Sequence, residues 1–291
     1  MCRFLTYSGP ATTMAALILD AELSLVVQSK SAEKRKIPTN ADGFGVGWYP
    51  LHDDPEPATF VSIEPVWSNR NLKVMANKVL SGHYFAHVRD ASLGMPVTPS
   101  NCHPFQCMNY LWMHNGRLDQ FDTFRRGLLN LLSERAFHLI QGNTDSEYAF
   151  ALFMDILGFK ENASAQELGD AMKKTILRIM LLRKEYGANT NAFLNFAVSD
   201  GKNTIVTRFA TDEKVRPASL FFTKGKLHSQ ANQVEIHATN ALDEQCVIVC
   251  SEPLTRQKNK WIKVERNHMV IANGNAVISQ APIDLPFQYE L

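Results

Sequence analysis

The spacing of apolar residues divides the chain into a strand-rich start, a helix-rich middle and a strand-rich end. Short alternating or continuous apolar runs predict strands in the first part, at 2–8, 44–49, 59–63, 82–89 and 108–114. Helices are predicted at 12–19, 23–28 and 69–80, and apolar residues at helical spacing predict amphipathic helices at 118–137, 144–158 and 165–186. Short apolar runs then return and predict strands at 192–199, 204–209, 219–223, 245–250 and 261–272.

The segments between these elements carry turn and loop residues. Gly9-Pro10 is predicted to end the first strand, and Asn115-Gly116 the strand at 108–114. The charged segment 29–42 has the composition of a surface loop over a site. No linker or repeat separates the three parts of the chain. The pattern therefore predicts one α+β domain over residues 2–291, with stacked antiparallel sheets and helices on their outer faces.

Composition narrows the class of protein further. The chain of 291 residues is 45% hydrophobic with a formal net charge of +1, so it can bury a sizeable core. That charge favours neither nucleic acid nor a membrane surface as a partner. Asp20 and Glu22 interrupt the apolar run at 14–27, which predicts neither a secretory signal nor a membrane span. Five cysteines, an odd number, indicate thiols in a reducing compartment, so a cytoplasmic protein is expected.

The second residue of the chain is a cysteine with two chemical groups of interest. If Met1 is removed, Cys2 carries a thiol and a free α-amine on the same carbon. An α-amine titrates near ~8 and an unperturbed thiol near ~8.5, so the amine can take the thiol proton and generate a nucleophile. The alternative is a small buried hydrophobic residue at the start of a strand. Position alone favours that structural interpretation.

The tripeptide His114-Asn115-Gly116 follows an apolar run and has two interpretations. Asn-Gly is a common and strong turn signal. The Asn115 side-chain amide and the Gly116 backbone N–H could instead donate to one oxygen, as in an oxyanion hole, where one donor is worth roughly 3–4 kcal/mol. The tripeptide alone favours the turn.

Two charged residues could bind the head group of an amino acid. Arg89 follows a buried strand, where it could pair with a protein carboxylate or hold a substrate carboxylate through its planar fork. Asp145 opens a helix whose Thr144 and Glu147 fit a capping box, and it could complement the helix dipole or bind an ammonium group. Together with Cys2 and the Asn115-Gly116 donors, these residues predict attack on the side-chain carbonyl of glutamine or another γ-glutamyl amide.

Two other kinds of site are disfavoured. His83 and His87 lie four residues apart near Cys102, His103 and Cys107, but positions four apart in a strand are too distant for one zinc ion. The glycines of 43–47 lack the spacing and the following helix of a dinucleotide-binding motif. No metal or organic cofactor is expected.

Several short motifs occur in the order found in one known family. They are Met1-Cys2-Arg3, the segment 42–49 (DGFGVGWY), the segment 87–92 (HVRDAS), Cys102-His103-Pro104-Phe105, His114-Asn115-Gly116, Thr144-Asp145-Ser146-Glu147 and Ser251-Glu252-Pro253-Leu254. The chain resembles the class II glutamine amidotransferases, which are N-terminal-nucleophile hydrolases. Within them it is most similar to the stand-alone branch of YafJ-like proteins and ergothioneine-pathway γ-glutamyl amidohydrolases.

The resemblance implies a fold and a set of site residues. The fold would be a four-layer αββα sandwich, with Cys2 as nucleophile and its own amine as base. Asn115 and Gly116 match the oxyanion hole of the family, and Arg89 and Asp145 match its ligands for the substrate carboxylate and amine. Further positions that match the pocket are Ser92 near the carboxylate, His103 in a His-Pro pair, and Trp48 with Gly47 at the wall.

The resemblance also frames the function. The larger family members carry a second catalytic domain, and none follows in this sequence, so hydrolysis of a γ-glutamyl amide is the main expectation. Two alternatives remain open: a glutaminase subunit that donates ammonia to a separate acceptor or synthase subunit, and a non-catalytic module that senses glutamine. A homo-oligomer is compatible with each.

Overall fold

The computed structural model describes residues 2–30, 40–52, 54–91, 95–212, 215–230, 233–274 and 277–285. Met1, Ser92 and most of the surface loop predicted at 29–42 lie outside these ranges. No helix among the described residues combines the length and apolar composition that a bilayer crossing needs.

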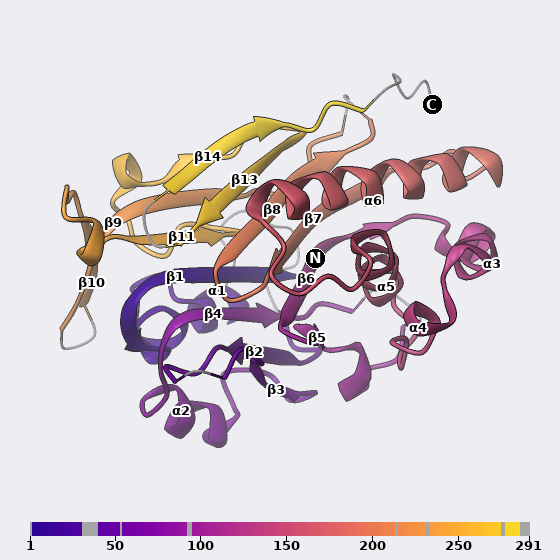
Figure 1. Ribbon diagram of the computed structural model, residues 1–291. Helices are drawn as coiled ribbons and strands as arrows, with labels where there is room; N and C mark the ends of the chain where they lie inside the picture. The colour runs from indigo at the N-terminus through magenta and orange to yellow at the C-terminus, as the bar shows by residue number, and fades with distance from the viewer. Residues whose placement is uncertain are drawn as a thin grey trace.

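The described strands form two antiparallel sheets stacked face to face (Figure 1). The first, which we call the N-sheet, has the order β10-β9-β11-β1-β4-β2-β3, and β12 pairs with β9. Its strands are β1 (Arg3–Thr13), β2 (Phe44–Trp48), β3 (Ala58–Ser62), β4 (Leu80–Val88), β9 (Phe221–Gln230), β10 (Gln233–His237), β11 (Cys246–Cys250) and β12 (Ile262–Lys263). The second, the C-sheet, has the order β14-β13-β8-β7-β6-β5. Its strands are β5 (Phe105–Cys107), β6 (Tyr110–Leu118), β7 (Ala192–Ser199), β8 (Asn203–Ala210), β13 (His268–Asn273) and β14 (Val277–Pro282).

Helices cover the outer face of each sheet, which makes the four layers predicted for an αββα sandwich (Figure 1). The helices on the C-sheet are α3 (Phe121–Leu131), α4 (Glu134–Phe137), α5 (Asp145–Leu157) and α6 (Ala165–Glu185). The helices on the N-sheet are a π-helical turn η1 (Ala16–Asp20), α1 (Leu25–Lys30) and α2 (Arg70–Ala76). Short 3₁₀ turns lie at η2 (Pro99–Asn101), η3 (Leu242–Glu244) and η4 (Lys258–Lys260).

The central strands are buried on both faces, and their side chains alternate between two cores. On β1, Phe4 packs between the sheets, whereas Leu5 and Tyr7 pack under the helices of the N-sheet. On β6, Met113 packs between the sheets, whereas Trp112 packs under the helices of the C-sheet. Because side chains alternate along a strand, even-numbered residues of β1 and odd-numbered residues of β6 face the space between the sheets. This parity determines which functional side chains can meet.

Two predicted strand ends are wrong, and pairing with neighbouring strands of the same sheet explains both. The Asn115-Gly116 pair is no turn, because β6 continues to Leu118 and pairs with β7 through both residues. The first strand does not end at Gly9-Pro10, because β1 continues to Thr13. Its register with β4 shifts between Ser8 and Thr12, an irregularity at which a proline without an N–H is tolerated.

Other boundaries also differ from the pattern. The helix predicted at 118–137 is two helices, because α3 ends at Leu131 and Ser133 caps α4. The strand predicted at 261–272 is divided into β12 and β13, and the short helix predicted at 12–19 is the π-helical turn η1. The strands β5, β10 and β14 were not predicted. By contrast, α5, α6 and β7 lie within a residue of their predicted ranges.

Candidate active site

Cys2 lies at the start of β1, in the middle of the N-sheet. Arg3 pairs with Val88 of β4, so Cys2 lies beside Arg89 and Asp90 at the end of that strand. The Asp90 N–H points to the Cys2 sulfur at 3.4 Å, and the thiol faces the Asp90 carbonyl at 3.6 Å. As an even-numbered neighbour of β1, the half-buried Cys2 shares the inner face of the sheet with Phe4.

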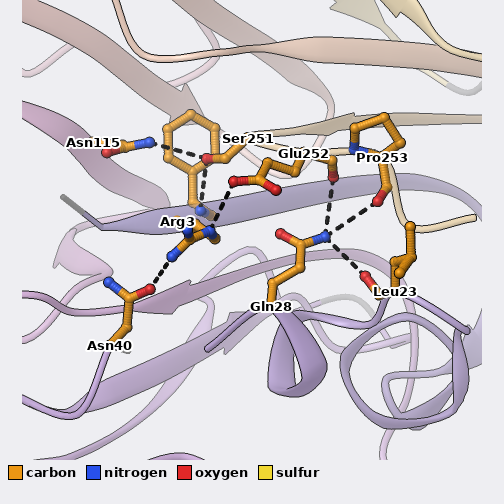
Figure 2. Close-up of polar contacts among 9 residues, drawn as sticks. Arg3, Leu23, Gln28, Asn40, Asn115, Ser251, Glu252 and Pro253 are labelled. Atoms are coloured by element: carbon orange, nitrogen blue, oxygen red, sulfur yellow. Dashed lines mark hydrogen bonds and ion pairs between the residues drawn. The ribbon is translucent and has the colours of Figure 1, made fainter. Parts of the chain in front are cut away.

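Asn115 lies on β6 of the opposite sheet and points toward Ser251 (Figure 2). It is fully buried on β6, and its Nδ2 donates to Ser251 Oγ at 3.1 Å. Ser251 Oγ also accepts from the Phe4 N–H at 3.0 Å. Ser251 therefore links the Asn115 amide to β1 at Phe4, which is two residues after Cys2.

The Gly116 N–H points to an edge of β6 that no described strand covers. His114 and Leu118, each two residues from Gly116, direct their backbone groups to this edge. The His114 carbonyl lies 3.2 Å from His87 Nε2, and the Leu118 N–H donates to Asp145 at 2.6 Å. Residues two apart in a strand direct their backbone groups to the same side, so the Gly116 N–H points there too. A side chain on Gly116 could not fit, because its Cβ would lie 1.8 Å from the Phe193 carbonyl oxygen.

Arg89 is a buried cation that forms no ion pair with any described residue. Arg89 is 4% exposed, and its Nη2 donates to the Pro96 carbonyl at 3.2 Å. Nη1 has no hydrogen-bond partner, and no carboxylate forms an ion pair with Arg89, among the residues that the structure describes. A buried guanidinium in this state is costly unless a carboxylate binds to it. Its planar fork suits such a ligand.

Asp145 begins α5, at the open edge of β6. Its Oδ2 accepts from the Leu118 N–H, and its Oδ1 lies 3.2 Å from the Ser146 hydroxyl, which also contacts His114 Nδ1 at 2.8 Å. It makes no ion pair within the described part of the chain. Leu118 follows Gly116 by two residues, so the Gly116 and Leu118 amides lie about 7 Å apart along the strand.

The cap of α5 differs in one half from the predicted capping box. Thr144 Oγ1 accepts from the Glu147 N–H at 3.2 Å, as predicted. The Glu147 carboxylate does not return to the N-cap; it accepts from the N–H groups of Gln141 and Gly142 at 2.7 and 2.8 Å. Burial raises the pKa of this carboxylate, while these two hydrogen bonds oppose the rise. Glu147 thus fixes the turn that precedes Asp145.

The other predicted pocket residues have different locations. Trp48 has the parity of Phe44 and Val46, which face the helices, so it lies on the opposite face of the N-sheet from Cys2. Gly47 faces inward, but Pro104 and Leu111 fill the space above it. The structure therefore brings neither Trp48 nor Gly47 to Cys2.

His103 is buried beside the site. It precedes a cis peptide bond to Pro104, and its ring centroid lies 4.2 Å from that of His87. Neither of its ring nitrogens has a hydrogen-bond partner among the described residues. Ser92 lies outside the described ranges. In the described part of the chain, His, Cys, Asp and Glu side chains form no group of three that could hold a metal ion.

A buried ion pair next to Cys2 was not predicted from the sequence (Figure 2). Arg3 is 1% exposed; its Nε lies 3.1 Å from Glu252 Oε1, and its Nη1 donates to Asn40 Oδ1. Gln28 Nε2 donates to the Leu23 and Glu252 carbonyls and so ties α1 to the same segment. Arg3 and Glu252 both stand in the short motifs, and that was the only signal available. Their pairing anchors the backbone that presents Cys2.

We predict that Glu252→Ala lowers the free energy of unfolding by about 3–5 kcal/mol, because it leaves the buried Arg3 charge uncompensated. Urea unfolding would measure the loss. The matched control is Glu22→Ala, which breaks an exposed pair with Arg256 and should cost less than about 1 kcal/mol. Equal losses in the two variants would contradict the anchoring role.

Buried histidines predict acid sensitivity. Burial lowers the pKa of His83 to about 4 and that of His87 to about 3, and it holds the pKa of His103 well below its usual value. The unfolded chain therefore binds more protons than the folded chain below pH ~6.5, and stability falls by roughly 1.4 kcal/mol per pH unit for each histidine.

We expect this loss to begin as the pH falls through 6.5 and, for His83, to continue to about 4. Urea unfolding at pH 7, 6 and 5 would measure it. His83→Gln should make the dependence shallower, whereas His138→Gln, a change at a side chain that is 71% exposed, should not. An unchanged slope in His83→Gln would contradict the prediction.

The fold indicates the class of protein. A four-layer αββα sandwich with Cys2 at the start of a central strand is the fold of the N-terminal-nucleophile hydrolases. A solved class-II glutamine aminotransferase domain protein from Silicibacter pomeroyi superposes with a TM-score of 0.66 at 21% identity, over 98% of this chain and 100% of that chain. The glutamine phosphoribosylpyrophosphate amidotransferase of Bacillus subtilis gives a TM-score of 0.60 at 15% identity, over 97% of this chain and 49% of that one.

Sequence comparison then gives the family. The family model "Glutamine amidotransferases class-II" matches residues 12–288. The "Probable glutamine amidotransferase DUG3" of Saccharomyces cerevisiae is 33% identical over 99% of this chain and 86% of that protein. The "Gamma-glutamyl-hercynylcysteine sulfoxide hydrolase" of Mycolicibacterium smegmatis is 31% identical over 62% of this chain and 74% of that protein. The chain belongs to the class-II glutamine amidotransferases, enzymes that act on γ-glutamyl amide bonds.

Proposed function

We propose that this chain hydrolyses a γ-glutamyl amide, glutamine included, through a thioester on Cys2. One observation carries the proposal: Arg89 lies beside Cys2, Asp145 is bonded to the strand that carries the Asn115 and Gly116 donors, and these two opposite charges form no ion pair among the described residues. A free amino-acid head group offers one carboxylate and one ammonium. It would satisfy both charges and would direct its side-chain carbonyl toward Cys2.

The proposed chemistry uses only this chain's own groups once Met1 has been removed. The Cys2 α-amine takes the thiol proton, directly or through one water, and the sulfur bonds to the carbonyl carbon of the γ-glutamyl amide. Asn115 Nδ2 and the Gly116 N–H stabilise the oxyanion. The C–N bond then breaks, and the protonated amine transfers its proton to the leaving nitrogen.

Hydrolysis of the thioester completes the cycle. The same amine takes a proton from a water molecule, whose oxygen bonds to the carbonyl carbon of the thioester. The C–S bond breaks, the sulfur recovers that proton, and glutamate leaves. The scheme needs no metal or organic cofactor.

The name of the mycobacterial relative supports a leaving group larger than ammonia, since that protein is named for hydrolysis of a γ-glutamyl conjugate. The name of the yeast relative supports a second candidate, a glutaminase subunit that supplies ammonia to an acceptor or synthase subunit. Activity of the isolated chain on a γ-glutamyl amide favours the first candidate. Negligible activity that a partner restores favours the second.

All five cysteines are thiols rather than disulfides, which supports a cytoplasmic location.

Intact-mass measurement before and after treatment with a glutamine-mimicking alkylator tests the proposal directly. We expect loss of Met1, one adduct on Cys2, and turnover of at least one member of a γ-glutamyl amide panel. Retained Met1 together with an unlabelled Cys2 and no turnover would favour the glutamine-sensing module instead.

Arg89→Ala should raise KM for glutamine by about 10- to 100-fold, because hydrogen bonds to a charged group contribute about 1.5–3 kcal/mol. Arg89→Lys should recover only part of the loss, since an ammonium lacks the planar fork. Steady-state kinetics would measure both changes. Arg70→Ala, on the exposed surface of α2, is the control. Unchanged kinetics in Arg89→Ala would remove Arg89 from the site.

A further inference from the structure

We propose that Asn101 is a positioning residue that sets the separation of Arg89 and Asp145, and with it the selectivity for an intact α-amino-acid head group. The proposal rests on the roles proposed above for those two charges. Asn101 itself lies in the turn η2, and among the described residues its side chain is hydrogen-bonded to Pro96 and Asn143 rather than to either charged group, so it would act through the backbone on both sides.

The amide of Asn101 is buried, and each of its polar atoms is bonded. Asn101 as a whole is 1% exposed. Nδ2 donates to the Pro96 carbonyl at 3.1 Å and to Asn143 Oδ1 at 2.9 Å, and Oδ1 accepts from the Asn143 N–H at 3.1 Å. A side-chain amide supplies the two N–H donors and the carbonyl acceptor that these three bonds need. Asn101 therefore joins two loops that are 42 residues apart in the sequence.

On one side, Asn101 shares an acceptor with Arg89. The Pro96 carbonyl that Asn101 binds also accepts from Arg89 Nη2 at 3.2 Å, the only hydrogen bond that the described residues give to this guanidinium. A shift of Pro96 would therefore move or release the guanidinium. Asn101 is the side chain that fixes this carbonyl.

On the other side, Asn101 fixes the turn that precedes Asp145. Asn143 comes directly before Thr144, the N-cap of α5. The same turn is held from the helix by Glu147, which accepts from the Gln141 and Gly142 N–H groups. The turn packs so closely on Asn101 that a Cβ on Gly142 would lie 2.4 Å from Asn101 Oδ1. The first turn of α5 thus has a fixed position relative to Pro96.

Asp145 has a second, independent anchor. Its Oδ2 accepts from the Leu118 N–H on β6, the strand that carries Asn115 and Gly116. Loss of Asn101 would leave Asp145 attached to β6. It would loosen Arg89 relative to Asp145 and to β6. Binding of the substrate carboxylate should weaken, whereas the chemical step at Cys2 should change little.

Asn101→Ala is therefore expected to raise KM for glutamine by about 10-fold or more while kcat stays within about 3-fold. Competitive inhibition gives a second readout. Binding of L-glutamate should weaken by the same factor, whereas binding of 4-aminobutyrate, which lacks the α-carboxylate, should not change. A purely structural role would weaken both ligands alike and lower kcat. Asn77→Ala, at an exposed asparagine that ends α2, is the matched control.

A double-mutant cycle with Arg89→Ala closes the test. If Asn101 acts through Arg89, the double variant should be little worse than Arg89→Ala alone, because the penalties are not additive for coupled residues. If Arg89→Ala raises KM and Asn101→Ala does not, the positioning role is overturned and the proposed function stands. If Arg89→Ala has no effect, the carboxylate role of Arg89 and the positioning role of Asn101 are both overturned, whereas hydrolysis through Cys2 is tested separately by Cys2→Ala. Should Asn101→Ala fail to fold, Asn143→Ala removes one of the three contacts from the other side and should give the same pattern more weakly.

Discussion

Replacing Cys2 with alanine is expected to lower kcat for γ-glutamyl amides by about 10⁴- to 10⁶-fold, as removal of a nucleophile does in other acyl-transfer enzymes. The thiol is half-buried at the start of β1 and lies against the Asp90 backbone, so its loss should leave the core intact. Binding of L-glutamate should therefore persist, since Arg89 and Asp145 are unchanged. Calorimetric titration with glutamate, next to a turnover assay, would separate the two effects.

Cys246→Ala is the matched control for this experiment. Cys246 lies at the far end of β11, and burial raises the pKa of its thiol to about 12, so it is neither near Cys2 nor ionised at neutral pH. This variant should keep its activity. Turnover by Cys2→Ala at a rate near that of the unmodified chain would refute the thioester scheme, whatever the other residues do.

Local chemistry explains which elements could be predicted from the sequence. The helix α5 was predicted nearly to the residue because Thr144 and Gly158, the residues that cap its two ends, are adjacent to it in the sequence. Asn115-Gly116 carries an equally strong local signal for a turn, but pairing with β7 through both residues overrides it. Tertiary pairing of this kind cannot be read from a tripeptide.

In the site, the chemistry of a side chain could be predicted from its residue type, but the direction in which it points depends on its place in the strand. Arg89, Asp145 and Asn115 were selected because their side chains suit a carboxylate, an ammonium and an oxyanion, and all three lie near the end of the sandwich that holds Cys2. Trp48 was selected by its motif, yet strand alternation turns it to the opposite face of the N-sheet.

Contacts between distant segments were beyond prediction. Arg3 and Glu252 lie 249 residues apart, and Asn101 and Asn143 lie 42 apart, so only the folded register brings each pair together. Each of these residues stands in or beside a short motif, but no local pattern names its partner.

The second large effect is expected at Asn115. Asn115→Ala should lower kcat by about 10²- to 10³-fold with little change in KM, because an oxyanion-hole donor acts mainly in the transition state. Asn115→Asp should be at least as inactive, since a carboxylate would repel the developing negative charge. Pre-steady-state measurement of thioester formation would show whether the loss falls on the acylation step.

The surroundings of Asn115 sharpen this prediction. Its Oδ1 is buried without a hydrogen-bond partner among the described residues, and its Nδ2 already donates one hydrogen to Ser251 Oγ. The Ser251 hydroxyl can also donate, so the amide turned by 180° would keep this contact through Oδ1 and direct both Nδ2 hydrogens elsewhere. Either orientation leaves at least one donor for the substrate. Ser251→Ala should therefore lower kcat less than Asn115→Ala does.

Asn195 provides the matched control, because it lies directly opposite Asn115 in the β6–β7 ladder and is equally buried. Its Nδ2 donates to the Ala218 carbonyl at 3.4 Å. Asn195→Ala should lower stability by about 1–3 kcal/mol through the lost hydrogen bond while kcat stays within about 3-fold. If both variants lost kcat to the same extent, Asn115 would act by packing between the sheets rather than as a donor to the oxyanion.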